Sequence, residues 1–200
     1  MRLHAKAEAE AVRFAVLHSL TLGAMLRGMS VREILTYPDP ALREIARPVD
    51  DVNSEALKQL VQDLADSMYD APGVGLAATQ IGVPLRVAVT DTRWREEDGE
   101  RDLKVWINPE IIRRAGEAIY EEGCLSVPGI YYDIKRAAEI TLRWQDMEGN
   151  HHSADFEGFQ AVALQHEFDH LDGKLFIDLL PPIKQKLLKK RLHKQKKMQE

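Results

Sequence analysis

Residues 165–173 read QHEFDHLDG, in which two histidines stand four positions apart and a glutamate follows the first. Side chains four residues apart on an α-helix lie on one face, one turn apart, so His166 and His170 can reach the same metal ion. Glu167 falls at the edge of that face, where a carboxylate can reach a water molecule on the metal without binding the metal itself. Phe168 points almost the opposite way and is expected to pack into the core. The stretch therefore predicts a metal-binding helix with a catalytic carboxylate.

A third metal ligand is expected upstream of this helix, because a catalytic metal usually has three protein ligands and one open position. The residues that follow the helix, 171–184, contain aspartates but no histidine or glutamate. Upstream, EEGCLSVPG (121–129) places Cys124 between a glycine and a turn-forming segment. A lone cysteine is otherwise most often a small buried hydrophobic residue. The predicted ligands are Cys124, His166 and His170, and a thiolate with two imidazoles suits zinc, iron, cobalt or nickel.

Other polar residues near these motifs have a plain structural alternative. Asp169 either supports a metal ligand through a hydrogen bond or is an ordinary exposed or structural residue. Gln80, taken alone, is an ordinary polar residue. His151 and His152 follow a Gly-Asn turn and are expected to lie in an exposed loop and not to bind the metal.

The composition is that of a soluble globular protein. The chain has 200 residues and a net charge of −5, with 44% hydrophobic and 30% charged residues, which is ordinary for one domain. No apolar run reaches the roughly 18 residues that span a bilayer; the longest candidate, residues 11–26, is interrupted by Arg13 and His18. A single cysteine excludes an intramolecular disulfide and suits a reducing compartment. We therefore expect a cytoplasmic protein with no membrane partner and no DNA partner.

The hydrophobic periodicity predicts a helix, then several short strands, then the histidine-bearing helix. The first helix covers 53–69, with Asn53 or Ser54 as its N-cap and a Pro-Gly pair after its end. Strand patterns follow, with a Gly-Asn turn among the last of them, at residues 85–90, 104–112, 118–120 and 133–158. The second helix covers 159–171 and is capped by Gly173. This order predicts an α+β fold, with antiparallel or mixed sheets packed around the helix that carries the two histidines.

Three motifs together resemble one known family, the peptide deformylases. GVGLAATQ (73–80), EGCLS (122–126) and QHEFDHLDG (165–173) occur in that family's order and with suitable gaps. The resemblance extends over roughly residues 30–185. It implies a hydrolase that removes the formyl group from the N-terminal formylmethionine of new polypeptides and releases formate. It also implies one divalent metal ion, commonly Fe²⁺, with Zn²⁺, Ni²⁺ or Co²⁺ possible in purified protein.

The resemblance also implies roles for residues around the metal. Glu167 would accept a proton from the attacking water and deliver it to the leaving nitrogen. The side-chain amide of Gln80 and the backbone N–H of Leu125 would stabilise the oxyanion. The formylmethionyl peptide would pair as an added strand along Gly73, Val74 and Gly75, and the two glycines would allow a close approach of the substrate backbone.

The charge distribution divides the chain. Residues 182–200 hold eight Lys or Arg and one Glu, so they carry +7, and the remaining residues carry −12 of the net −5. We expect residues 29–182 to form the catalytic domain and residues 183–200 to form a basic, helical C-terminal tail. Residues 1–28 are expected to be an extension of unknown role, either upstream of the natural start or a transit peptide, although Glu8 and Glu10 are atypical of the latter.

The basic tail is either a solvated, frayed helix or a binding site for the ribosome near the polypeptide exit. Some deformylases carry a C-terminal helix with the second role, and clustered lysines would bind rRNA phosphates. Deleting residues 184–200 is expected to weaken ribosome binding without abolishing hydrolysis of short formyl peptides. Two other kinds of protein compete with the deformylase interpretation: a metalloprotease that cleaves internal peptide bonds, and a non-catalytic ribosome-binding protein with a structural metal.

Overall fold

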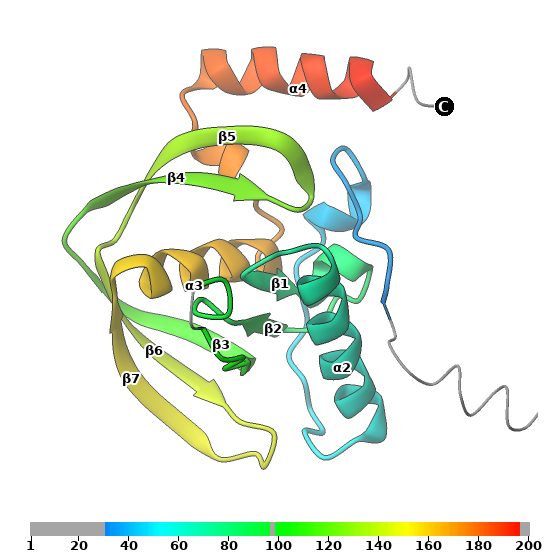
Figure 1. Ribbon diagram of the computed structural model, residues 1–200, viewed down its shortest axis with the longest axis vertical. Coiled ribbons are helices and arrows are strands. Elements are labelled where there is room, and N and C mark those ends of the chain that lie inside the picture. Colours follow the sequence, from blue (N-terminus) through cyan, green and yellow to red (C-terminus); the bar gives the residue numbers. More distant parts are fainter. Residues whose placement is uncertain (1–30, 97–98, 197–200) are drawn as a thin grey trace, which may run out of the picture. The chain divides into compact units, whose positions relative to one another are not determined.

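The computed structural model describes residues 31–96 and 99–196, so the predictions for residues 1–28 and for the last four residues lie outside it. The described part has three α-helices (Figure 1), α2 (Glu55–Asp70), α3 (Gly158–Leu171) and α4 (Pro182–Lys196). Three short 3₁₀ helices join them, η1 (Pro40–Arg43), η2 (Ala78–Ile81) and η3 (Phe176–Leu179). No helix among the described residues is long and apolar enough to cross a membrane.

Two antiparallel sheets make up the β-structure. Five strands pair in the order β1-β2-β3-β6-β7, with the bounds Gly75–Ala77, Val87–Thr90, Lys104–Ala115, Glu139–Gln145 and His151–Glu157. The second sheet is a hairpin of β4 (Ala118–Cys124) and β5 (Val127–Arg136). The expected α+β fold is confirmed. The predicted strand region 133–158 contains the end of β5 together with β6 and β7, whereas residues 127–132 of β5 were not predicted as a strand.

The first helix begins close to its predicted position. Ser54 is the N-cap, and its side chain accepts the N–H of Leu57 at 3.3 Å. The apolar face of α2 is buried against β1 and β2, where it forms one of the hydrophobic clusters of the core. Each such buried leucine contributes roughly 1.5–3 kcal/mol. This packing fixes the segment that follows α2 and leads into β1.

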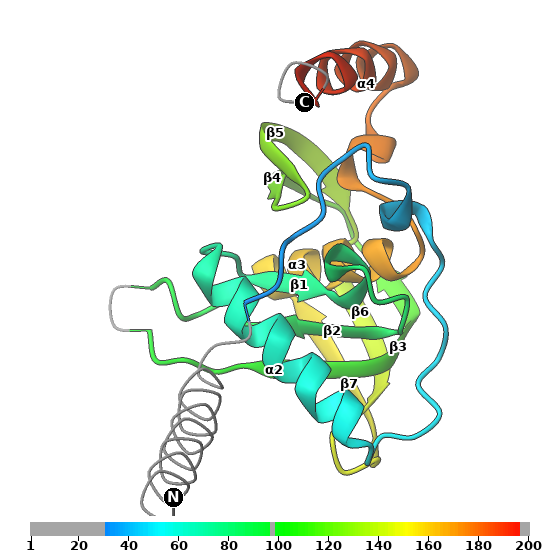
Figure 2. The same cartoon turned by 90° about the vertical axis from the view of Figure 1, so that its right-hand side faces the viewer.

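Helix α3 lies between the two sheets, as both views show (Figures 1 and 2). Leu164, Phe168 and Leu171 pack toward the five-stranded sheet with residues such as Ile140, so the expected direction of Phe168 is confirmed. The opposite side of the helix carries the two histidines toward the β4–β5 hairpin. Because both sides are covered, α3 is buried along most of its length, and its ionisable side chains lie in a low-dielectric environment.

Helix α4 is solvated on most of its described surface, but one side of it packs against the rest of the described chain. Leu188 and Leu192 are buried in a hydrophobic cluster with residues of β5 and η3. Asp178 of η3 accepts a hydrogen bond from Lys189 at 2.8 Å and also pairs with Arg43. Burial opposes the charge on Asp178, but these two cations outweigh it and hold the pKa of its carboxyl below the usual value. The helix is thus attached to the rest of the described chain by apolar and ionic contacts.

The His151–His152 pair is exposed, as expected, but it does not lie in a loop. The two residues begin β7. His152 Nε2 lies 2.6 Å from Asp146 Oδ2, and the imidazole ring stacks on the ring of Trp144. These contacts tie the β6–β7 turn together, and neither histidine belongs to the metal-ligating group of the described residues.

Candidate active site

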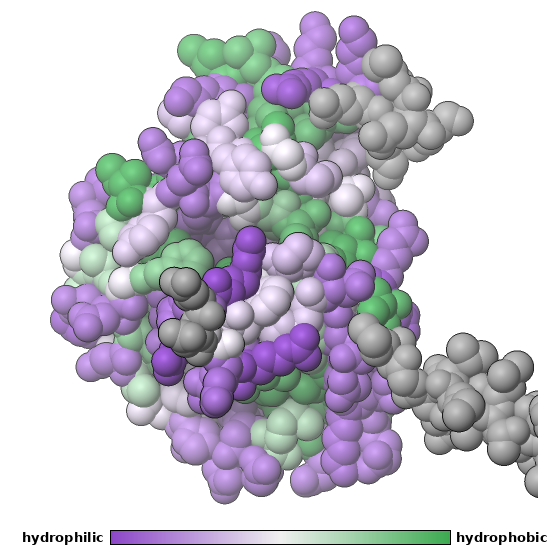
Figure 3. Space-filling model, in the orientation of Figure 1, coloured by the Kyte–Doolittle hydropathy of each residue, from purple (hydrophilic) through white to green (hydrophobic). Residues whose placement is uncertain are grey.

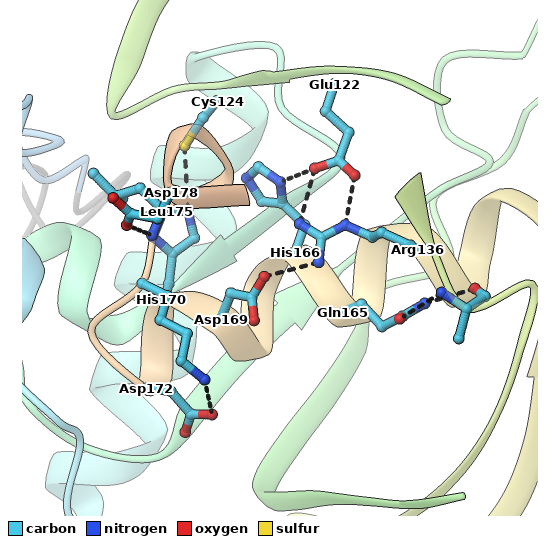
Figure 4. Close-up of polar contacts among 12 residues, drawn as sticks. Glu122, Cys124, Arg136, Gln165, His166, Asp169, His170, Asp172, Leu175 and Asp178 are labelled. Carbon is cyan, nitrogen blue, oxygen red and sulfur yellow. Dashed lines mark hydrogen bonds and ion pairs between the residues drawn. The ribbon is translucent and has the colours of Figure 1, made fainter. Parts of the chain in front are cut away.

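The three predicted ligands lie together. Cys124 ends β4, and His166 and His170 lie one turn apart on α3. One ligand atom from each can be chosen so that all three lie within 4.8 Å of one another. Cys124 Sγ is 3.2 Å from His170 Nε2 (Figure 4). A thiolate and two imidazoles that converge in this way fit a single soft or borderline divalent cation.

His166 is oriented by a buried chain of charges, of which sequence reasoning singled out only Asp169. Its Nδ1 lies 2.8 Å from Glu122 Oε2, which directs Nε2 toward the metal site. Arg136 donates to both carboxylate oxygens of Glu122, and its Nη1 donates to Asp169 at 2.8 Å (Figure 4). A carboxylate behind a metal-binding histidine fixes the tautomer and ring orientation. A signal was present, because Glu122 stands two residues before Cys124, and alternate strand residues share a face.

Glu167 lies beside the same ligands with one oxygen free. Its Oε2 is buried and has no hydrogen-bond partner among the described residues. A Cβ added to Gly75 would come within 2.4 Å of Glu167 Oε1, and one added to Gly73 would meet the Leu125 side chain at 2.8 Å. The two glycines of the first motif therefore make room for enzyme side chains that line the site.

Gln80 has a fixed orientation. Its Oε1 accepts the N–H of Ala77 at 2.8 Å, and its Nε2 donates to Ser126 Oγ at 3.1 Å. Because a backbone N–H can only donate, the oxygen must face Ala77, and the amide NH₂ must face the metal site. The same nitrogen lies 3.8 Å from Cys124 Sγ.

Leu125 stands in the turn that joins β4 to β5. Cys124 pairs with Val127, so Leu125 and Ser126 form a two-residue loop. In such a hairpin the N–H of the first loop residue takes no part in the strand ladder. The backbone N–H of Leu125 therefore remains available beside the thiolate ligand that precedes it.

A cleft of about 390 Å³ opens onto these groups. Glu167 and His166 line it, and residues 72–75 form one wall. The other wall is largely apolar, with contributions from Tyr120, Leu125, Val127, Ile130, Phe159 and Val162. A mostly apolar cleft with a few converging polar groups is typical of a site for a small substrate group.

Comparisons with known proteins agree on one family. The family model described as Polypeptide deformylase matches residues 31–186. A peptide deformylase of Alkalilimnicola ehrlichii is 49% identical over 166 residues, which cover 83% of this chain and 91% of that protein. A crystal structure of a peptide deformylase from Legionella pneumophila matches with a TM-score of 0.75 and 46% identity, covering 84% of this chain and 97% of that one.

The chain belongs to the peptide deformylase family. It is a metal-dependent hydrolase that removes the N-formyl group from nascent peptides. The metalloprotease and the non-catalytic ribosome-binding protein are therefore wrong interpretations. A deformylase of class I type b from Acinetobacter baumannii, solved with Met-Ala-Ser bound, matches with a TM-score of 0.70 at 33% identity, covering 75% of this chain and 98% of that one.

The ionisable groups of this deformylase site have pKa values that are shifted in different directions. Burial opposes charge on His166, but Cys124 and Glu122 beside it outweigh that effect and raise its pKa well above the usual value. Burial lowers the pKa of His170 well below the usual value. Burial also raises the pKa of Glu167 to about 7, although His166 and Arg136 oppose the rise. The anionic surroundings that favour a proton on His166 also favour a cation between the three ligands.

Proposed function

We propose that Cys124, His166 and His170 hold one Fe²⁺ ion in this deformylase and leave one position open to substrate. The mixed sulfur and nitrogen ligand set supports this assignment, and it also accepts Zn²⁺, Ni²⁺ or Co²⁺. When bound, the cation supplies Lewis acidity, which polarises a carbonyl oxygen and lowers the pKa of water toward about 7. Elemental analysis of protein prepared without oxygen tests the identity of the metal. Iron at one equivalent is expected, and zinc under those conditions contradicts the proposal.

Glu167 moves the proton in the proposed reaction. The observation that carries this role is its buried Oε2, which has no partner among the described residues although it lies in the cleft beside the three ligands. A carboxylate in this position accepts a proton from the attacking water and delivers it to the nitrogen of the departing amine. The formamide C–N bond then breaks, and formate and a free amino terminus result.

Gln80 and Leu125 stabilise the oxyanion in the same proposal. The Gln80 amide is held by Ala77 with its NH₂ toward the metal site, and the Leu125 N–H lies outside the hairpin ladder. Both donors are therefore oriented before substrate binds, so no reorganisation is needed during the reaction. A preorganised donor of this kind contributes about 2.7–4 kcal/mol to lowering the barrier.

The formylated peptide binds as an added strand along Gly73, Val74 and Gly75. Strand β1 is the edge strand of its sheet, so one side of it has no neighbouring strand among the residues that the structure describes. The side chain of formylmethionine then enters the apolar part of the cleft between Tyr120 and Val162. The A. baumannii relative was solved with the tripeptide Met-Ala-Ser bound, and a short peptide of that kind fits this description.

Formate release from N-formyl-Met-Ala-Ser tests the assignment of roles. Metal-replete wild-type protein is expected to release formate, and Glu167→Ala is expected to lose nearly all of that activity. A Glu110→Ala variant changes an exposed acid on β3 far from the ligands in sequence, and it serves as the matched control. Full activity of Glu167→Ala with bound metal would remove Glu167 from the mechanism.

We further propose that α4 binds the ribosome near the polypeptide exit, so that the enzyme acts on nascent chains in the cytoplasm. The outer side of α4 exposes Ile183 and Leu187, which are 76% and 66% accessible. Lysine and arginine residues surround this apolar stripe, and Figure 3 shows hydrophobic and hydrophilic residues side by side over α4 at the top of the view. Cationic side chains around an apolar stripe suit a surface that combines rRNA phosphates with a protein contact.

Substitutions on the outer side of α4 test this better than a deletion. Deleting residues 184–200 would uncover the cluster that Leu188 and Leu192 complete. Replacing Lys186 and Lys190 with glutamate changes exposed charges only, and it should weaken co-sedimentation with ribosomes, most strongly at low salt. The same double replacement at Arg113 and Arg114 on β3 is the control. Equal ribosome affinity of both variants would contradict the proposal.

The division of the chain is part of the proposal. Residues 29–182 form the catalytic domain and residues 183–200 form the basic tail. No role is assigned to residues 1–28. A chain that starts at Met29 is expected to hydrolyse formyl-Met-Ala-Ser as fast as the full chain. A large loss of activity would show that the extension contributes to the domain.

A further inference from the structure

The segment after β2 is fastened at both ends by one carboxylate. Asp91 Oδ1 accepts the backbone N–H of Trp94 at 3.1 Å, and Asp91 Oδ2 accepts the N–H of Asp102 at 2.8 Å. The hydroxyl of Tyr69 on α2 donates to the same carboxylate at 2.7 Å. The start and the end of the segment 91–102 are therefore held at α2, which fixes where Trp94 stands.

Trp94 and its neighbour Arg95 each donate a hydrogen bond to the backbone just before β1. Trp94 Nε1 donates to the carbonyl oxygen of Gly73 at 2.8 Å, and its ring meets Tyr69 edge-on with centroids 5.3 Å apart. Arg95 Nη1 donates to the carbonyl oxygen of Pro72 at 3.1 Å. Arg95 also lines the active-site cleft. The two side chains therefore stand at one end of the wall along which the substrate is expected to pair.

The direction of each backbone group on this wall follows from one hydrogen bond. The carbonyl of Val74 accepts the N–H of Asp91 at 2.9 Å, so Val74 faces β2. The N–H and C=O of one strand residue point to the same edge, and successive residues alternate. Gly75 in β1 therefore points to the open edge, where the substrate would pair. Gly73 precedes β1, and its N–H donates to the carbonyl of Met68 at 2.8 Å, so only its carbonyl could pair with a substrate. That carbonyl is already taken by the indole of Trp94.

The distance along the wall identifies the substrate residue involved. Gly75 lies at the catalytic end, because it packs against Glu167. A strand rises about 3.3 Å per residue, so Gly73 lies roughly 6.6 Å further out. If formylmethionine pairs beside Gly75, the third residue of the peptide lies beside Gly73, next to Trp94 and Arg95.

We propose that Trp94 ends the substrate strand at Gly73 and that Arg95 recognises a carboxylate on the third residue of the formylated peptide. This rests on the strand pairing proposed above. A guanidinium has five N–H donors, of which Pro72 is described as taking one, and the rest suit a carboxylate. A lysine at the same position would be repelled by the guanidinium. Arg95 is thus a specificity-determining residue.

A series of amidated tripeptides tests the charge preference. Formyl-Met-Ala-Xaa-amide, with Asp, Asn or Lys as Xaa, carries no terminal carboxylate, so only the side chain can supply one. For the wild type, kcat/KM is expected to be about three- to fivefold higher for Asp than for Asn, as for an exposed ion pair, and lowest for Lys. The free-acid form of the Asn peptide shows whether a terminal carboxylate serves equally well.

Arg95→Ala is expected to bring the Asp-to-Asn ratio close to one. Arg93→Ala removes the same charge two residues away, where the side chain lies near Glu96 and does not line the cleft, and it should keep the wild-type ratio. Raising the salt from 0.1 M to 1 M should also erase the preference, because it shortens the screening length from about 10 Å to about 3 Å. An unchanged ratio in Arg95→Ala overturns the role of Arg95.

Trp94→Phe tests the end of the strand, since phenylalanine keeps an aromatic ring but has no N–H to donate. Adding a third residue to formyl-Met-Ala-amide is expected to change the wild-type kcat/KM less than twofold. In Trp94→Phe the gain should be severalfold, because the Gly73 carbonyl is released to pair with the peptide. Equal gains in both proteins overturn the role of Trp94. If no formyl peptide is hydrolysed by the wild type, the proposed function fails instead.

Discussion

Two buried carboxylates near His166, Glu122 and Glu167, have pKa values that are shifted in opposite directions. Glu122 and Glu167 are almost equally buried, at 6% and 5% exposure. Hydrogen bonds from His166 and Arg136 outweigh the effect of burial on Glu122 and hold its pKa below the usual value. Burial dominates at Glu167 and raises its pKa to about 7. The depth of burial therefore does not decide the pKa of a carboxylate here; the hydrogen bonds with His166 and Arg136, which Glu122 makes and Glu167 lacks, decide it.

Replacing Glu167 with glutamine should have the largest effect on activity. The amide cannot carry the proton, so kcat/KM for a formyl peptide should fall by about 10²- to 10⁴-fold. Metal content and thermal stability should stay near the wild-type values, because Glu167 Oε2 has no partner to lose. Formate release, elemental analysis and thermal unfolding measure these quantities. Loss of the metal in this variant would contradict the comparison, because Glu167 would then support metal binding as Glu122 does.

Arg136→Met should have the largest effect on stability. The change leaves the charges of Glu122 and Asp169 buried or half-buried without their cation, and it should lower the free energy of unfolding by about 3–5 kcal/mol. Denaturant unfolding of the metal-loaded protein measures this. Arg143→Met is the control, because its exposed pair with Glu110 contributes at most about 1 kcal/mol. Equal losses in the two variants would contradict the assignment.

Glu122→Gln should produce a smaller and different defect. The amide keeps the shape of the side chain but orients His166 less strongly, and metal affinity should fall by about 10- to 100-fold. Competition with a chelator measures the affinity. Activity should recover when metal is added, unlike that of Glu167→Gln. A variant with normal affinity and lost activity would exchange the roles of the two residues.

Asp169→Asn should have the smallest effect. Its side chain is 21% exposed, and it pairs with only one nitrogen of Arg136. Water can partly replace it, so the free energy of unfolding should fall by about 0.2–1 kcal/mol. Metal affinity should be unchanged within error. If the free energy of unfolding fell as much as in Arg136→Met, Asp169 would contribute to the buried ion pair as strongly as Glu122 does.

The metal centre was predictable from sequence because its information is local. His166 and His170 are one helical turn apart, and Cys124 is the only cysteine. Glu122, Arg136 and Asp169 were harder to find, because β4, β5 and α3 each contribute one residue and no spacing links them. Asp169 had a signal in its position beside the two histidines, and Glu122 had one in its two-residue offset from Cys124; Arg136 had none.

The fold was predictable to a similar extent. Helices α2 and α3 follow the periodic patterns closely. Strand β1 and residues 127–132 of β5 were not predicted, because glycines and a Val-Pro-Gly sequence in these stretches favour turns. The packing of α4 could not be foreseen, since Leu188 and Leu192 look like sparse apolar residues among lysines until β5 is placed beneath them. The hydrogen bond from Trp94 to the carbonyl of Gly73 could not be predicted either, because it depends on the path of a loop with no regular pattern.

The packing of α4 has a consequence for local unfolding of the protein. Leu188 and Leu192 share their apolar cluster with Val127, Ile130 and Ile134 of β5, the strand that follows the cysteine ligand. Segments that share a core open together in local unfolding, and their amide hydrogens exchange at a common rate. The C-terminal helix and the hairpin thus form one cooperative unit. We therefore expect detachment of the helix and displacement of Cys124 to occur together, and we expect a bound metal ion to slow exchange in both segments.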